Sequence, residues 1–230
     1  MGMKILIVSD SHGHNEIIDD LIRENKDVDI FLHAGDSEVP AYTLFPFRVV
    51  RGNCDYIYDT EMEYVIPSPF GNILLRHKDD RNVAYLKEHE IKIYIHGHTH
   101  VKECYKKNGI CYINPGSLVY PRDEDSSYAI MESDEKACYL AFYDVETKKF
   151  LKAYKIYITD GYGNYIDAPT TEDKTQMEQM YETLEEMRFR RRKEEEKKIE
   201  EKEEEIKEEE DLSSLPPDPL TPYIEEEKED

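Results

Sequence analysis

Several polar side chains that can bind metal ions stand directly after short apolar runs of the sequence. Asp10 and His12 follow the run KILIV, and their i,i+2 spacing directs both side chains to one side of an extended chain. Comparable donors follow later apolar runs: Asp36, Asn53, His77, His98 and His100. In open α/β sheets, ligands bind in the crevice outside the carboxyl ends of the strands. We therefore expect these seven side chains to lie together at one rim of a sheet.

The seven donors are carboxylate, carboxamide and imidazole groups, and this set suits Mn²⁺, Fe²⁺, Zn²⁺ or similar ions. Seven ligands are too many for one tetrahedral ion, but they suit two ions that share a bridging carboxylate. Such ions lie about 3.5–4 Å apart and bind the attacking and leaving oxygens of an in-line displacement. A glycine precedes Asp36, Asn53 and His98, and we expect it to permit the tight turn that directs each donor inward.

The elements that would position these donors alternate between strand and helix in the first part of the chain. Ile18 and Leu21 lie on the apolar face of a predicted first helix, and a short surface helix is predicted over 80–89. The runs 61–66 and 73–77 are predicted to form a hairpin. The other predicted strands cover 4–8, 28–33, 47–51, 91–96, 101–106, 110–113, 127–132, 137–143 and 150–158. This order predicts a layered α/β/β/α sandwich of two mixed sheets.

The cysteines and the N-terminal segment both indicate a cytoplasmic protein. Asn108-Gly109 predicts a two-residue hairpin turn that pairs Lys106 with Cys111 and Cys104 with Ile113. The two thiols then share a face only diagonally, which suits a disulfide poorly, so we expect free cysteines. The segment MGMKILIVSD has too short an apolar run for a signal peptide, and no stretch approaches the length of a membrane span.

Acidic residues dominate the chain and are concentrated towards its end. The formal net charge of the 230 residues is −22, and residues 170–230 carry 24 acidic and 11 basic side chains. We expect no stable nucleic-acid binding from such a chain, whereas a small phosphorylated substrate is compatible with it. The composition predicts three parts: a folded domain with one core at 1–169, a charged helical extension at 170–211 and an acidic, Pro-rich disordered tail at 212–230. The tail is a candidate for binding a protein partner, and self-association is left open.

Five sequence blocks occur in an order that resembles a known family. They are SDSHG at 9–13, HAGD at 33–36, RGNCD at 51–55, IHGHTH at 95–100 and YINPGS at 112–117. Together they resemble the calcineurin-like metallophosphoesterases, most of all the small phosphodiesterases of the YfcE type, which share their fold with the retromer subunit Vps29. The resemblance covers roughly residues 3–145.

The resemblance implies a dinuclear metal-dependent phosphoesterase, most of all a phosphodiesterase, in which a hydroxide between the ions attacks phosphorus. It assigns Asp10, His12, Asp36 and His100 to the first ion. It assigns Asp36, Asn53, His77 and His98 to the second ion, with Asp36 as the bridge. Mn²⁺ is the expected ion, with Ni²⁺, Fe²⁺, Zn²⁺ and Mg²⁺ as alternatives. We expect Asp36, Asn53 and His98 to act in catalysis as well as in metal binding.

Two positions depart from the pattern of the family. The family usually has His-Gly-His or His-Gly-Asp at the fifth ligand, whereas this chain has His77-Lys78-Asp79, so the loop beside the second ion differs. Cys54 stands where many larger relatives have a histidine that assists the leaving group. The small subgroup shares the cysteine at this position. The alternative function is a Vps29-like scaffold with weak or no turnover, which the altered loop and the acidic tail favour. A nuclease of the same superfamily is disfavoured by the acidic charge.

Overall fold

The structure, a computed structural model, describes residues 2–56, 60–68, 70–133, 137–159, 165–166 and 170–172, together with Lys193 and Lys197. The chain divides into two compact units, Met1–Met177 and Glu178–Asp230, and every element named below belongs to the first. The predicted helical extension and disordered tail lie outside the described residues, apart from Lys193, Lys197 and a strand at Thr170–Glu172.

Eight of the described strands form the first sheet, in the order β12-β11-β10-β9-β1-β2-β3, with β13 paired to β11. Its strands are β1 (Met3–Val8), β2 (Ile30–His33), β3 (Arg48–Val49), β9 (Ser127–Ser133), β10 (Ala137–Asp144), β11 (Phe150–Thr159), β12 (Tyr165–Ile166) and β13 (Thr170–Glu172). The pairs β1–β2 and β2–β3 are parallel, and the remaining pairs are antiparallel. The strand predicted at 47–51 is shorter than expected, because the chain leaves β2 after Val49 and Val50 bridges to Glu61 instead.

The second sheet has the order β4-β5-β6-β8-β7 and is also mixed. Its strands are β4 (Glu63–Ile66), β5 (Asn72–Arg76), β6 (Ile91–Ile95), β7 (Lys102–Lys107) and β8 (Ile110–Pro115). The predicted hairpin of β4 and β5 is confirmed, and so is the β7–β8 register that pairs Lys106 with Cys111. Asn108 and Gly109 have φ values of 54° and 81°, as their turn requires. The thiols of Cys104 and Cys111 are 3.8 Å apart, in hydrogen-bond contact and without a covalent bond, and none of the four cysteines forms a disulfide.

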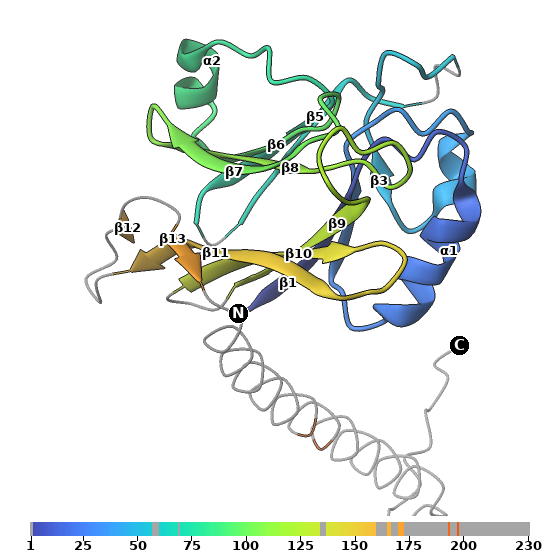
Figure 1. Cartoon of the computed structure of the whole chain (residues 1–230). Helices are drawn as coiled ribbons and strands as arrows, with labels where there is room; N and C mark the ends of the chain where they lie inside the picture. The colour runs from blue at the N-terminus through green and yellow to red at the C-terminus, as the bar shows by residue number, and fades with distance from the viewer. Residues whose placement is uncertain are drawn as a thin grey trace, which may run out of the picture. The chain divides into compact units, whose positions relative to one another are not determined.

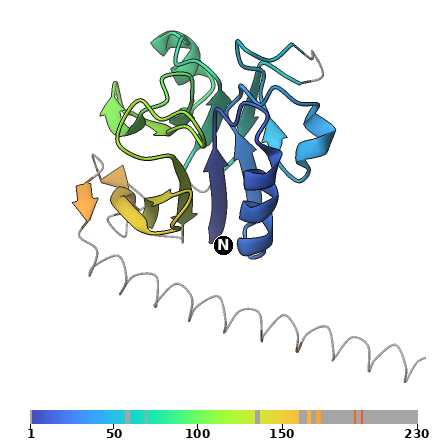
Figure 2. The ribbon, with the colours of Figure 1, turned by 45° about the vertical axis from the view of Figure 1, so that its right-hand side comes forward.

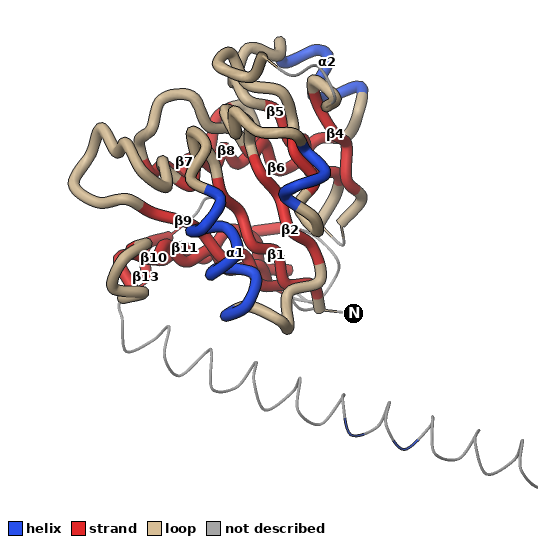
Figure 3. Tube along the Cα trace, turned by 90° about the vertical axis from the view of Figure 1, so that its right-hand side faces the viewer, coloured by secondary structure: helices blue, strands red, loops and turns tan. Residues whose placement is uncertain are grey.

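The two sheets pack face to face, with one helix on each outer face (Figures 1 and 3). Alternate side chains of β1 serve the two sides of its sheet. Ile5 and Ile7 belong to the buried cluster between the sheets, which includes Ile73 and Ile95 of the second sheet. Their neighbour Leu6 packs with the helix α1 (Asn15–Glu24), which lies along β1 in Figure 2.

The outer face of the second sheet is covered in the same way. Leu86 of the helix α2 (Val83–Glu88) is buried against Leu74 and Tyr94. A short 3-10 helix, η1 (Ala41–Leu44), packs beside α1 through the buried Leu44. The predicted α/β/β/α sandwich of two mixed sheets is therefore confirmed. Among the described helices none is long and apolar enough to cross a membrane.

Candidate metal centre

The seven predicted donors lie in the loops that follow β1, β2, β3, β5 and β6. Five of them have a left-handed backbone, with φ values of 53° at Asp10, 44° at His12, 54° at Asp36, 68° at His98 and 60° at His100. Non-glycine residues rarely adopt this conformation, which costs of order 1–3 kcal/mol per residue and persists where surrounding contacts enforce it. The concentration of strained residues at one rim is a physical mark of a functional site.

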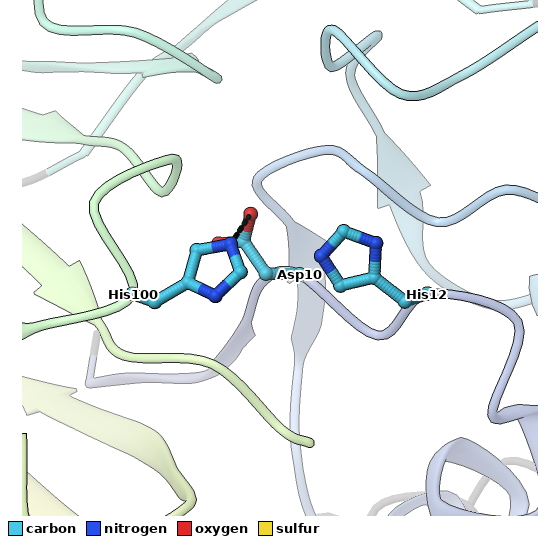
Figure 4. A group of neighbouring side chains, drawn as sticks. All are labelled: Asp10, His12 and His100. Atoms are coloured by element: carbon cyan, nitrogen blue, oxygen red, sulfur yellow. Dashed lines mark ion pairs between the residues drawn. The ribbon is translucent and has the colours of Figure 1, made fainter. Parts of the chain in front are cut away.

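Asp10, His12 and His100 form the first group of donors, with one atom of each within 4.8 Å of the others (Figure 4). His100 uses its Nδ1 to contact the carbonyl oxygen of Tyr120 at 2.7 Å, which leaves Nε2 at 3.2 Å from Oδ1 of Asp10. The Nδ1 atom of His12 contacts Oε1 of Glu38 at 2.7 Å. Nε2 of His12 is buried and has no hydrogen-bond partner among the described residues, and the buried Oδ1 of Asp10 faces the ring of His100.

Asp10, Asp36 and His77 form the second group by the same distance criterion. His77 donates its Nδ1 hydrogen to the carbonyl oxygen of Ala34 at 2.8 Å. The lone pair on Nε2 then faces two oxygens, Oδ1 of Asn53 at 3.1 Å and Oδ2 of Asp36 at 3.3 Å. Three acceptors that converge in this way need a cation between them, either a proton or a metal ion.

His98 completes the rim. Its ring centroid lies 5.1 Å from that of His77, and its backbone N–H donates to Oδ2 of Asp10 at 3.1 Å. The structure therefore brings all seven predicted residues to one place, with Asp10 common to both groups. A third group of donor atoms, from His12, Glu38 and Cys54, adjoins the first.

Charge and burial set the protonation of these groups. Burial acts to raise the pKa of Asp36, but the contact with a protonated His77 ring and the hydrogen bond from the N–H of Cys54 outweigh it and hold that pKa well below its usual range. Burial acts to lower the pKa of His77, yet its contacts with Asp36 and the charge of Asp10 raise it. The hydrogen bond with Asp10 raises the pKa of His100, whereas burial and the nearby His77 lower that of His98.

The thiol of Cys54 is kept neutral in this environment. Burial and the charge of Asp36 raise its pKa to about 11. A neutral thiol is a poor metal ligand, because the thiolate is the form that binds. The amide of Asn53 donates to this sulfur at 3.3 Å, which leaves the amide oxygen directed at His77.

The three glycines before the ligands are needed for two different reasons. Gly35 has a φ of 98°, so the expected tight turn is present before Asp36. At Gly52 a Cβ atom would overlap the carboxylate of Asp36, and at Gly97 it would overlap the hydroxyl of Ser9. Neither has a positive φ, so at these two positions the expectation of a glycine-specific turn was wrong, and the glycine provides room for a neighbouring side chain.

Asp55 supports the centre and was not singled out from the sequence, although it ends the block RGNCD. Its Oδ2 accepts from the N–H groups of Asp36 at 3.0 Å and Gly52 at 2.6 Å. Its Oδ1 accepts from the hydroxyl of Ser37 and from the N–H of Glu38 at 2.7 Å. One buried carboxylate thus ties the loop after β2 to the loop after β3.

The block YINPGS supports the other side of the centre through two side chains. The amide of Asn114 donates to the carbonyl of Gly97 and to the hydroxyl of Thr99, both at 2.9 Å. The hydroxyl of Ser117 donates to the carbonyl of Asp10 at 2.9 Å. These contacts hold the loop of His98 and His100 and the loop of Asp10 in place.

Comparison with known proteins identifies the family. Residues 3–136 match the calcineurin-like phosphoesterase superfamily domain. The probable metallophosphoesterase YsnB of Bacillus subtilis is 32% identical over 154 residues, which cover 62% of this chain and 91% of that protein. A probable metallophosphoesterase of Methanothermobacter thermautotrophicus is 29% identical over 150 residues, covering 57% of this chain and 87% of that protein.

Solved structures share the fold. A conserved protein of Streptococcus pneumoniae described as a predicted phosphoesterase aligns with a TM-score of 0.59, 23% identity, and coverage of 75% of this chain and 99% of its own. The phosphoesterase Yfce of E. coli aligns with a TM-score of 0.52 and 20% identity, covering 66% of this chain and 98% of its own. Vps29 of Entamoeba histolytica complexed with Zn²⁺ aligns with a TM-score of 0.51 and 21% identity, covering 66% of this chain and 98% of its own. Family model, curated relatives and fold agree, so the chain belongs to the calcineurin-like phosphoesterase superfamily, a family of hydrolases that act on phosphoester bonds.

Proposed function

We propose that this chain is a dinuclear metal-dependent phosphodiesterase whose own side chains hold both ions. One ion would be held by Asp10, His12, Asp36 and His100, and the other by Asp36, Asn53, His77 and His98. The observation that carries the proposal is the common orientation of the His77 and His100 rings. Each ring directs Nδ1 at a backbone carbonyl and presents Nε2 to a carboxylate. Metal-binding histidines are oriented in this way in proteins.

The donors fit divalent ions better than they fit protons. A proton could relieve the close approach of His77 to Asp36, but it would serve that pair alone. The buried Nε2 of His12 also needs a partner, and a cation that accepts several lone pairs at once can serve it together with Asp10 and His100. We expect Mn²⁺, and the Zn²⁺ carried by the Vps29 structure places that ion among those to be tried.

When bound, two divalent ions would supply a nucleophile at neutral pH by lowering the pKa of water, and would neutralise charge on the phosphoryl oxygens. The residues of the chain orient this chemistry. Asp36, which the family resemblance makes the bridge, is fixed by the N–H of Cys54 at 2.7 Å and lies beside Asp10. His98 has a lowered pKa, which keeps its ring neutral and able to bind metal. Cys54 stands after Asn53 in place of a histidine, and its neutral thiol is a poor proton donor to a departing group. We therefore expect the enzyme to prefer substrates with good leaving groups.

The test is turnover of a generic aryl diester and monoester. Protein freed of metal with a chelator and reloaded with Mn²⁺ should hydrolyse bis(4-nitrophenyl) phosphate faster than 4-nitrophenyl phosphate. Asp36→Asn removes the proposed bridge, and Asp19→Asn makes the same change at an exposed position of α1. Loss of turnover in the first variant alone would show that the activity belongs to this site and not to a contaminant. Faster hydrolysis of the monoester would contradict the diesterase assignment.

A scaffold of the Vps29 kind is the second candidate, because Vps29 shares the fold. Against it stands the retention of a competent donor at each of the seven positions. Metal uptake without turnover of either ester would favour the scaffold. Under either function we propose that residues 1–169 form the metallophosphoesterase domain, and that the acidic remainder is a separate extension able to bind a protein partner.

A further inference from the structure

An open cavity adjoins the part of the metal centre built from Asn53 and His77. Its volume is about 260 Å³, and the other residues that line it are Arg51, Gly52, Met62, Arg76, Lys78 and Asp80. Three of these side chains are cationic and one is acidic. In a chain with a net charge of −22, such a lining is a local reversal of sign. A cavity with this charge attracts anionic groups.

Two of the three cations already have partners within the protein. Arg76 contacts Asp80 at 2.6 Å and Glu63 at 3.2 Å. Arg51 donates to the carbonyl oxygen of Thr60 at 3.0 Å. Lys78 is exposed, and its ammonium has no ion pair with any residue that the structure describes. Lys78 is therefore the cation of this lining most accessible to a bound molecule, because Arg76 is paired with two carboxylates and Arg51 is less exposed and held against a backbone carbonyl.

The backbone of Lys78 is held firmly, although the glycine usual at this position in the family is missing. The hydroxyl of the buried Tyr94 donates to the carbonyl oxygen of Lys78 at 2.5 Å. The pair of Arg76 and Asp80 spans the loop from one side of Lys78 to the other. Glu63 braces the same loop by accepting from Arg81 at 2.8 Å and from the hydroxyl of Tyr85 at 2.6 Å. Because the backbone of the loop is already fixed, binding a ligand there costs less loop entropy.

We infer that this cavity binds a second anionic group of the substrate, with Lys78 as its specificity-determining contact. The substrate would then be a phosphoester that carries a further negative charge, such as a carboxylate, on one of its esterified groups. His77 and Lys78 are adjacent in the chain. One loop would therefore bind a metal ion through His77 and the second anionic group of the substrate through Lys78. This inference rests on the proposed function, because it places the phosphoester at the metal centre.

Equilibrium binding tests this inference independently of turnover. The full-length chain in the presence of Mn²⁺ is titrated calorimetrically with two series of phosphonates that have matched chain lengths. One series ends in a carboxylate and the other in a methyl group. The carboxylate series should bind more tightly at the best chain length, by about tenfold, as one charge-assisted contact provides. Added salt should reduce this preference, because the contact is solvent-exposed.

Variants of Lys78 decide whether that residue is responsible. Lys78→Gln should abolish the preference for the carboxylate series, and Lys78→Arg should retain most of it. Lys87→Gln removes the same charge from an exposed position on α2 and should leave the preference unchanged. Equal affinity for the two series in the unmodified chain, or an undiminished preference in Lys78→Gln, would overturn the inference. Retention of the preference in a protein that hydrolyses no phosphoester would instead refute the proposed function alone.

Discussion

The Nε2 atom of His77 lies 3.3 Å from Oδ2 of Asp36, while Nδ1 of the same ring contacts the carbonyl oxygen of Ala34 at 2.8 Å. The carbonyl fixes the hydrogen on Nδ1, so the free lone pair is directed at a carboxylate. Without a cation between Nε2 of His77 and Oδ2 of Asp36 this arrangement is repulsive. With a metal ion between them, the two atoms become two of its ligands. His100 repeats the arrangement with Tyr120 and Asp10 at the other side of the rim.

Asp36→Asn should lower kcat/KM for an aryl phosphodiester by more than about a hundredfold, the usual scale for a lost electrostatic contact at a reacting centre. The amide keeps the size of the side chain but removes the negative charge that both ions would share. Metal content per chain should fall in the same variant, while circular dichroism shows an intact fold. Wild-type turnover at the same metal supply would contradict the assignment of Asp36.

Asp55→Asn should loosen the metal centre although Asp55 binds no metal in our assignment. The carboxylate accepts hydrogen bonds from two loops, and an amide nitrogen in place of one oxygen would face N–H donors. We expect a loss of about 1–3 kcal/mol in the free energy of unfolding and weaker Mn²⁺ binding, both measured on purified protein. The exposed Asp19→Asn serves as the matched control. Unchanged Mn²⁺ affinity would show that the two loops hold their shape without Asp55.

His33 should make the stability of the metal-free protein depend on pH. The N–H of Gly35 donates to its Nδ1 and Ser11 contacts its Nε2, and burial lowers its pKa to about 4 from an ordinary 6.5. Below pH 6.5 His33 binds a proton in the unfolded chain but stays neutral in the folded chain. The free energy of unfolding therefore falls as the pH drops from 6.5 towards 4. The loss over that window is about 3 kcal/mol.

Urea unfolding at a series of pH values between 4 and 7.5, with a chelator present, measures this dependence. His33→Gln should be less stable at pH 7 but should show a shallower decline below pH 6.5. His14→Gln, at a half-exposed position, should keep the slope of the unmodified chain. An identical slope in His33→Gln would mean that other groups cause the acid sensitivity.

Cys54→Ser should retain most of the activity on an aryl phosphodiester. The pKa of the thiol, raised to about 11, leaves it neither a thiolate ligand nor an effective proton donor at neutral pH. Cys54→His should selectively improve hydrolysis of alkyl diesters, whose poor leaving groups need a proton. A loss of about a hundredfold or more in Cys54→Ser, the scale of a lost acid–base group, would assign the thiol a direct role.

The residues of the candidate site could be predicted because their chemistry is local. Donor side chains at strand ends stand out in the sequence, and the turn Asn108-Gly109 determines the register of β7 and β8. Supporting residues are harder to find. Asp55 contacts Asp36 across 19 positions, and Glu38 contacts His12 across 26, so no local pattern reveals either pair. The reason for Gly52 was missed likewise, because it depends on the side chain of Asp36 packing from another loop.

Metal stoichiometry distinguishes a dinuclear centre from a mononuclear one. Metal-free protein is titrated with Mn²⁺, and bound ions are counted per chain while electron paramagnetic resonance reports whether they are magnetically coupled. We predict two ions per chain with a coupled signal in the unmodified protein, and one uncoupled ion in His77→Ala. A single ion in the unmodified protein, or two coupled ions in His77→Ala, would contradict this prediction.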